Sequence, residues 1–131
     1  MHLARRAVLA GLFIAAMIGG STANAAERAV FEAKAFQAAQ DSGKSILVHV
    51  TAPWCGECKI QKPIVADLAG RPEFKSLTIF EVDFDTQKDA LRALRVPMQS
   101  TLIAFKGKAE TGRSVGVTRR EGIQELMNKA I

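Results

Sequence analysis

The sequence predicts an α/β protein in which helices cover a β-sheet, and three stretches carry this prediction. The run "SILVHVTA" at 45–52 is apolar and β-branched, which is typical of a buried central strand. The run "TIFEVDFD" at 78–85 alternates apolar and acidic side chains, as a second strand does. Between them, Ile60, Ile64 and Leu68 recur every four positions and indicate one face of a helix.

Helices are expected before and after each of these two strands. Residues 30–40 predict a short extended start and then a helix, which Gly43 ends. The helix after the first strand is expected to end at Gly70. Thr86 and Asp89 have the spacing of a capping box, so we expect them to open a helix that Pro97 terminates.

The C-terminal part predicts a hairpin followed by a helix. Residues 101–105 ("TLIAF") form a third strand, 106–108 a turn and 114–117 a returning edge strand. A second capping box at 118–121 opens the last helix. The residues that this helix is expected to bury are Ile123, Leu126, Met127 and Ala130.

The first 25 residues predict a secretory signal peptide. A short basic start at 1–6 precedes an apolar run at 7–20, and Ala23-Asn24-Ala25 gives the small-residue spacing of a cleavage site. The apolar run is short for a membrane anchor, which needs about 20 residues. We therefore expect cleavage after Ala25, a domain at 26–131, and a location in a periplasm or outside the cell. Arg5-Arg6 permits twin-arginine export, but the ordinary secretory route is preferred.

Charge and aromatic content argue against nucleic-acid binding. The net charge is +5, and removal of Arg5 and Arg6 with the leader leaves 16 basic against 13 acidic residues, or +3. The remaining basic residues form no stripe interleaved with aromatics. Tyr is absent and Trp54 is the only Trp, so no platform for stacking bases is expected.

Cys55 and Cys58 are the only cysteines, and their spacing suits a redox pair better than a structural staple. A disulfide stabilises mainly by closing a long loop, whereas this one closes almost none. Cys55 lies where a buried strand meets a helix, so the helix N-terminus should stabilise its thiolate, the attacking species in disulfide exchange. Cys58 lies one turn further in and should be more shielded. It can attack a mixed disulfide on Cys55 and release the partner.

The stretch "WCGECK" resembles the active site of thioredoxin, Trp-Cys-Gly-Pro-Cys-Lys. Pro63 matches the proline that kinks the active-site helix of that family, and "STLIAFKGK" resembles the strand after the family's proline loop. The resemblance covers the chain from about Val30 onward and implies a thioredoxin fold, with a central mixed β-sheet flanked by helices. It also implies Cys55 as attacking thiol, Cys58 as resolving thiol, and a reversible Cys55–Cys58 disulfide with no separate cofactor.

Two departures from the family pattern bear on the chemistry. Glu57 replaces the proline between the cysteines, and a carboxylate there disfavours thiolates, which favours a reductant. Exposure to water would make that effect small. His49 stands where the family buries an Asp, and Glu81 where it tends to place a Lys. We expect His49 to accept the proton of the resolving thiol, with Glu81 orienting its ring; the alternative is a core histidine held by a backbone partner.

A third departure concerns the loop that faces the cysteines. Alignment on Thr101 puts Ser100 at the position of the family's cis-proline. A non-proline cis bond costs about 2.5–4 kcal/mol, so a trans loop is compatible with the sequence. Met98, Gln99 and Ser100 are expected to contact substrate from this loop. Trp54 and Gly56 are expected to do so from beside the nucleophile, although plain packing of Trp54 is an equal alternative.

The sequence therefore predicts an exported thiol–disulfide oxidoreductase, more a reductant than an oxidant. Its expected partners are protein thiols and disulfides and a membrane-bound thiol donor, and it is expected to be a monomer. The main alternative is a carrier of copper or zinc through Cys55 and Cys58, with His49 and Met98 as further soft or borderline ligands. A binding module with incidental thiols is a third possibility.

Overall fold

The computed structural model describes residues 24–131, so the expected leader lies outside the described residues except for its last two positions. No helix in the described range is long and apolar enough to cross a membrane. The elements in chain order are β1 (Glu27–Val30), α1 (Ala33–Asp41), β2 (Ser45–Thr51), α2 (Gly56–Ala69), the 3-10 turn η1 (Pro72–Phe74), β3 (Leu77–Asp83), α3 (Lys88–Leu94), β4 (Thr101–Lys106), β5 (Ala109–Val115) and α4 (Arg120–Asn128).

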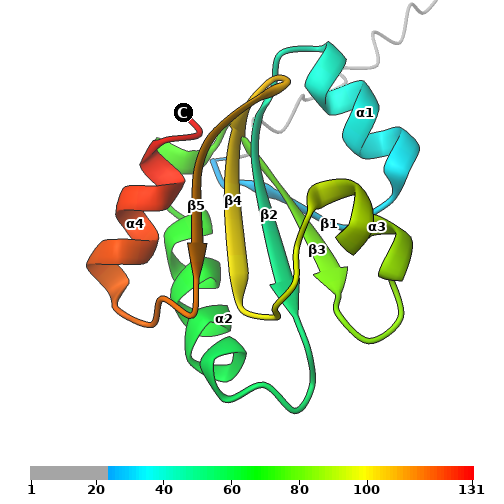
Figure 1. Ribbon diagram of the computed structural model, residues 1–131. Helices are drawn as coiled ribbons and strands as arrows, with labels where there is room; N and C mark the ends of the chain where they lie inside the picture. Colours follow the sequence, from blue (N-terminus) through cyan, green and yellow to red (C-terminus); the bar gives the residue numbers. More distant parts are fainter. Residues whose placement is uncertain (1–23) are drawn as a thin grey trace, which may run out of the picture.

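The sheet is mixed and has five strands in the order β1-β3-β2-β4-β5 (Figure 1). β3 runs parallel to both β1 and β2, whereas β4 is antiparallel to β2 and β5. The β2–β3 register sets His49 opposite Glu81, as the alignment with the family predicted. On the other side of β2, His49 is opposite Leu102 of β4. The expected mixed sheet of a thioredoxin fold is confirmed.

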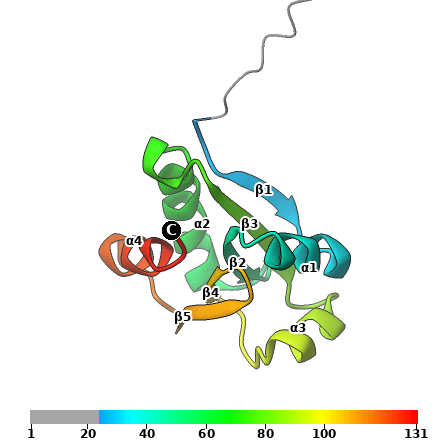
Figure 2. The ribbon, with the colours of Figure 1, turned by 90° about the horizontal axis from the view of Figure 1, so that it is seen from above.

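Helices cover both faces of this sheet (Figures 1 and 2). Helices α1 and α3 pack with Val48 and Val50 on one face, and α2 and α4 pack with Leu47 on the other. Successive side chains of β2 therefore pack into two separate cores, because both sides of this central strand are buried. His49 lies on the α2 side, where it is the polar member of an otherwise apolar row.

The inward face of α2 differs from the predicted one. Ile60 is 50% exposed, whereas Gln61, Val65 and Leu68 are fully buried. The helix is rotated so that Cys58 and Gln61, three residues apart, point inward together. Spacing by fours alone could not separate these two faces, because both carry residues compatible with burial. Pro63 lies inside α2, as the resemblance implied.

Both predicted capping boxes are wrong. Helix α3 begins after Gln87 and α4 after Arg119, and neither N-cap side chain accepts a hydrogen bond from the first turn of its helix. In the first case the Asp83 carboxylate already accepts from the backbone N–H of Asp85 and of Thr86, so the turn is closed from the strand side. The returning strand also begins earlier than expected, at Ala109.

Candidate active site

The two cysteines lie where β2 ends and α2 begins. Cys55 is the N-cap of α2, with φ −80° and ψ 117°, and its Sγ accepts a hydrogen bond from the backbone N–H of Cys58 at 3.1 Å. The sulfur therefore satisfies one of the N–H groups that have no partner inside the helix. Cys55 and Cys58 are joined by a disulfide. The same N–H and the helix dipole would stabilise a thiolate on Cys55 after reduction.

The expected difference in shielding between the two sulfurs is small in this oxidised form. Cys55 is 1% exposed and Cys58 is 0% exposed. Both pack against Ala52, because the disulfide holds Cys55 against its buried partner. Gly56 leaves room beside the pair, since a Cβ at that position would meet nothing within 4 Å. An approaching chain can use that space without displacing another part of the protein.

Glu57 lies close to the attacking sulfur. Its Oε2 is 3.7 Å from Cys55 Sγ, so the carboxylate is beside the site of the future thiolate. A negative charge there disfavours the thiolate by repulsion. Glu57 is exposed, and water therefore screens part of this repulsion.

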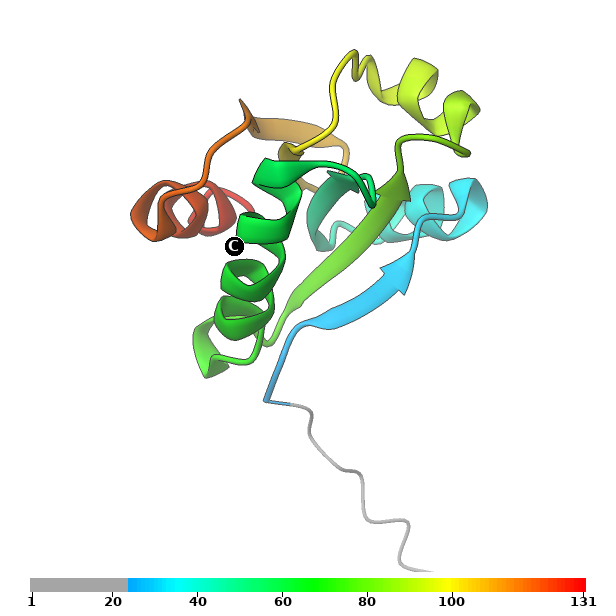
Figure 3. The same ribbon diagram turned by 90° about the horizontal axis from the view of Figure 1, so that it is seen from below.

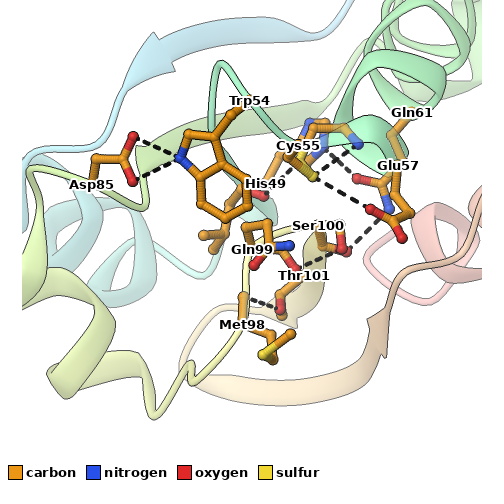
Figure 4. Close-up of a disulfide and its surroundings, with 12 residues drawn as sticks. His49, Trp54, Cys55, Glu57, Gln61, Asp85, Met98, Gln99, Ser100 and Thr101 are labelled. Atoms are coloured by element: carbon orange, nitrogen blue, oxygen red, sulfur yellow. Dashed lines mark hydrogen bonds between the residues drawn. A yellow bond between two sulfur atoms is a disulfide. The ribbon is translucent and has the colours of Figure 1, made fainter.

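Trp54 is held in place while most of it stays exposed. Its Nε1 donates to both carboxylate oxygens of Asp85 at 3.1 Å (Figure 4). Its ring meets that of Phe84 edge-on, with centroids 6.3 Å apart. The residue is 58% exposed, which plain core packing does not explain. Asp85 was not identified from the sequence, although a carboxylate just beyond β3 at the same sheet edge was a usable signal.

The loop before β4 lies beside the cysteines and Trp54 (Figure 4). Ser100 has φ 58°, and no peptide bond in residues 24–131 is cis. The Ser100 hydroxyl donates to the carbonyl of Gln99 at 2.6 Å, and the Thr101 hydroxyl donates to that of Met98 at 2.7 Å. Ser100 is 3% exposed and Met98 is 49% exposed. The loop thus turns through a left-handed serine in place of a cis-proline.

His49 is fully buried, and Gln61 of α2 holds its ring. Its Nε2 lies 3.0 Å from Gln61 Oε1. The orienting bond expected from Glu81 is a wrong prediction, because the Glu81 carboxylate pairs with Arg28 at 2.5 Å. Burial lowers the pKa of His49; the Gln61 bond and the Glu81 charge raise the pKa but oppose burial only in part. His49 is therefore neutral at pH 7.

Gln61 connects three elements and was missed in the sequence. Its Nε2 donates to the carbonyl of Ser100 at 3.0 Å and to that of Val117 at 2.8 Å. The sequence signal that could have identified Gln61 is its place three positions after Cys58, on the same face of one helix. It was missed because the sequence analysis assigned the inward face of α2 to other residues.

The geometry lends no support to a metal carrier. Within residues 24–131, no group of three or more His, Cys, Asp or Glu side chains is placed to hold a metal ion.

The thioredoxin family model matches residues 27–129. The chain belongs to the thioredoxin family. It is 35% identical to an H-type thioredoxin of Fagopyrum esculentum over 70% of this chain and 77% of that protein. It is 34% identical to the thioredoxin of Chlamydia trachomatis over 64% of this chain and 80% of that protein. The crystal structure of Trxlp from Edwardsiella tarda is 40% identical, with a TM-score of 0.74, over 76% of this chain and 98% of the other.

The family membership and the Cys55–Cys58 pair make this protein a thiol–disulfide oxidoreductase. The thioredoxin family acts on protein disulfides and uses no cofactor, so the electrons are held by the two sulfurs themselves.

Proposed function

We propose that this thioredoxin-family protein is an exported reductant of protein disulfides. The Cys55 thiolate attacks a disulfide of the partner, a Cys55–partner bond forms, and one partner sulfur leaves as a thiolate. Cys58 then attacks Cys55, the Cys55–Cys58 bond forms, and the second partner thiol is released. The observation that carries this proposal is the hydrogen bond from the Cys58 backbone N–H to Cys55 Sγ at 3.1 Å.

Reduction is the favoured direction because of Glu57. A stabilised thiolate makes a dithiol a poor reductant, since the reduced form is then the stable one. The Glu57 carboxylate, 3.7 Å from Cys55 Sγ, opposes the stabilisation that the helix N-terminus supplies. The couple is therefore expected to be less oxidising than one with a neutral residue at this position.

Five residues form the proposed surface for the partner. Exposure supports this role for Trp54 and Met98, and open space supports it for Gly56. Gln99 and Ser100 would contribute mainly backbone groups, because the Ser100 side chain is buried and bonded within its own loop. The substrate would therefore meet an apolar rim on two sides of the sulfur pair.

The proposed location is a periplasm or the extracellular space, after cleavage near Ala25. Reductants that work in an oxidising space need a supply of electrons. A membrane-bound thiol donor would reduce Cys55–Cys58 by the same exchange run in the opposite sense. We also propose a monomer, since a single site with an open rim needs no second copy.

The reduction potential tests the proposed direction. Equilibration of the purified chain with a thiol–disulfide buffer of known potential, followed by acid quench and mass measurement, should give a value near about −270 mV. The matched variant Glu57→Gln removes the charge at nearly constant shape, and its potential should be higher. A value near about −120 mV for the unaltered chain would mark an oxidant and overturn the proposal.

Export has a separate test. In a host that exports the full chain, the mature protein should begin at Ala26 and be found outside the cytoplasm. Retention of residues 1–25 on a cytoplasmic protein would contradict this part of the proposal.

A further inference from the structure

Gln61 is an amide buried at 0% exposure on a helix face whose other inward residues are cysteine and apolar side chains. Burying an amide without hydrogen bonds is strongly unfavourable. Its three bonds, to His49, to Ser100 and to Val117, therefore have to be made in the folded protein.

These three bonds determine which way the amide faces. The carbonyls of Ser100 and Val117 can only accept, so both must receive hydrogens from Gln61 Nε2. The opposite orientation would set the Gln61 oxygen against two carbonyl oxygens. Gln61 Oε1 therefore faces His49 Nε2, 3.0 Å away, and it can only accept. His49 Nε2 must carry a hydrogen.

The other ring nitrogen is consequently the basic one. Among residues 24–131, Nδ1 of His49 is buried and has no hydrogen-bond partner. In a neutral ring with hydrogen on Nε2, Nδ1 carries the free electron pair. An unpartnered acceptor inside a core is uncommon and calls for an explanation.

Cys58 is the thiol that such an acceptor would serve. It lies on α2 one turn before Gln61 and on the same face, and it is also fully buried. Its Sγ is 3.9 Å from the carbonyl oxygen of Val50, the residue that follows His49 in β2. Cys58, Gln61 and His49 thus adjoin one short segment of the β2–α2 interface.

We propose that Gln61 is a positioning residue, which holds His49 as the Nε2–H tautomer so that Nδ1 receives the proton of Cys58. The proposal rests on the proposed disulfide exchange and deepens it. During resolution the Cys58 S–H bond breaks and an Nδ1–H bond forms. The Cys58 sulfur then bonds to Cys55, the Cys55–partner bond breaks, and the departing partner thiolate takes up the proton from His49 or from water. No oxidant or reductant other than the partner disulfide is consumed.

The charges around His49 come from three elements. Glu81 of β3 favours a proton on the ring, whereas Lys62 of α2 and Arg28 of β1 disfavour one. Burial lowers the pKa of His49, so Nδ1 carries no proton at neutral pH and can accept one. Opposite His49 in β4 is Leu102, which does not titrate.

The test measures the tautomer of His49 and the rate of the resolution step separately. Because the chain has two histidines, a His2→Gln background leaves His49 as the only one. Long-range ¹H–¹⁵N spectra of the reduced chain should then show hydrogen on Nε2 at pH 7. In Gln61→Met the tautomers should mix. The resolution rate, followed by acid quench and mass after mixing with a small aromatic disulfide, should fall at least about tenfold.

Controls separate positioning from general damage. The attack rate of Cys55 should change less than about twofold in Gln61→Met, since the cap on Cys55 Sγ is untouched. Gln87→Met removes a comparable amide, which bonds Phe31 and Asp83 away from the cysteines, and should leave both rates and the His49 tautomer unchanged. If Gln61→Met does not fold, the tautomer of the reduced wild-type chain decides, because hydrogen on Nδ1 of His49 at pH 7 would overturn the proposal.

Two failures can be told apart. A wild-type chain that performs no exchange overturns the proposed function. A wild-type chain that exchanges normally, with an unchanged His49 tautomer or an unchanged resolution rate in Gln61→Met, overturns only the role of Gln61. Hydrogen on Nδ1 of His49 in the wild-type chain at pH 7 has the same meaning.

Discussion

His49 is a neutral base inside the core, and this makes the stability of the protein depend on pH. Because burial lowers the pKa of His49 in the folded state, the unfolded chain binds a proton that the folded chain does not bind. The stability is therefore fully present above the unfolded pKa, about 6.5, and falls as the pH drops below it. The loss approaches about 1.4 kcal/mol per pH unit until the folded pKa is reached.

Urea unfolding of the oxidised chain between pH 7.5 and 5 measures this slope. Asp67 and Glu110 do not interfere, because arginine partners lower their pKa values and their contributions vanish only at more acidic pH, below about 4. In a His2→Gln background, His49→Gln keeps a polar side chain that does not titrate, and the slope in this window should flatten. An equal slope in both proteins would contradict a neutral, buried His49.

At this scale the sequence indicated candidate reacting residues but not the residues that hold them. Cys55, Cys58 and His49 could be predicted as candidates because their signals are local, a spacing or a polar residue in an apolar strand. Gln61 and Asp85 act through partners far along the chain, Val117 and Trp54. Such contacts depend on helix rotation and loop path, which neither hydrophobic spacing nor motif spacing determines.

At the scale of elements, the loop between α3 and β4 depends on Ser100. A side chain at φ 58° carries a steric penalty of roughly 1–2 kcal/mol that glycine avoids. Ser100→Gly should therefore stabilise the protein by up to about 1 kcal/mol, less whatever the bond to the Gln99 carbonyl contributes. Ser100→Ala is the matched control, since it removes the hydroxyl and keeps the Cβ.

Proline is the residue that the family has at this position, and here it should destabilise the loop. Its ring fixes φ near −65°, so it cannot adopt the conformation that Ser100 has. Chemical unfolding should show Ser100→Pro to be less stable by at least about 1 kcal/mol. A proline variant as stable as the wild type would show that the loop rearranges freely, and the Gln61 bond to the Ser100 carbonyl would then not hold it.

Element boundaries were predictable where glycine or proline marked them. Gly43 has φ 70° just after α1, and Gly107 has φ 56° in the β4–β5 turn, where a Cβ would come within 3.2 Å of Gly43. The start of α4 was not predictable in this way. The carbonyl of Val117 is held by Gln61, and the backbone N–H of Gly116 donates to the Ser100 carbonyl. The chain before α4 is thus tied to the active-site loop, and the helix begins after Arg119 instead of Thr118.

At the scale of the whole molecule, β1 connects the N-terminal end of the domain to the neighbourhood of the site. It runs along β3 at the edge of the sheet (Figure 3), and Arg28 within it pairs with Glu81. Just before β1, the backbone N–H of Ala26 donates to the carbonyl of Ala69 at 2.8 Å. These contacts all lie at or after Ala26, so a chain that begins there retains them.

Two truncations test this arrangement. A chain that begins at Ala26 should unfold within about 0.5 kcal/mol of the full chain. A chain that also lacks 26–30 should be less stable by a few kcal/mol, at about 1 kcal/mol for each hydrogen bond lost. The loss should be no larger, because all four residues of β1 are exposed and bury little apolar surface.

Loss of Arg28 also frees the Glu81 carboxylate opposite His49, which should raise the pKa of His49. Arg28→Ala keeps the strand and should reproduce only this second effect, seen as a change in the pH dependence of unfolding between pH 5 and 7.5. If deletion of 26–30 left both the free energy of unfolding and its pH dependence unchanged, β1 would not stabilise the domain. The edge of the sheet would then have no influence on the pKa of His49.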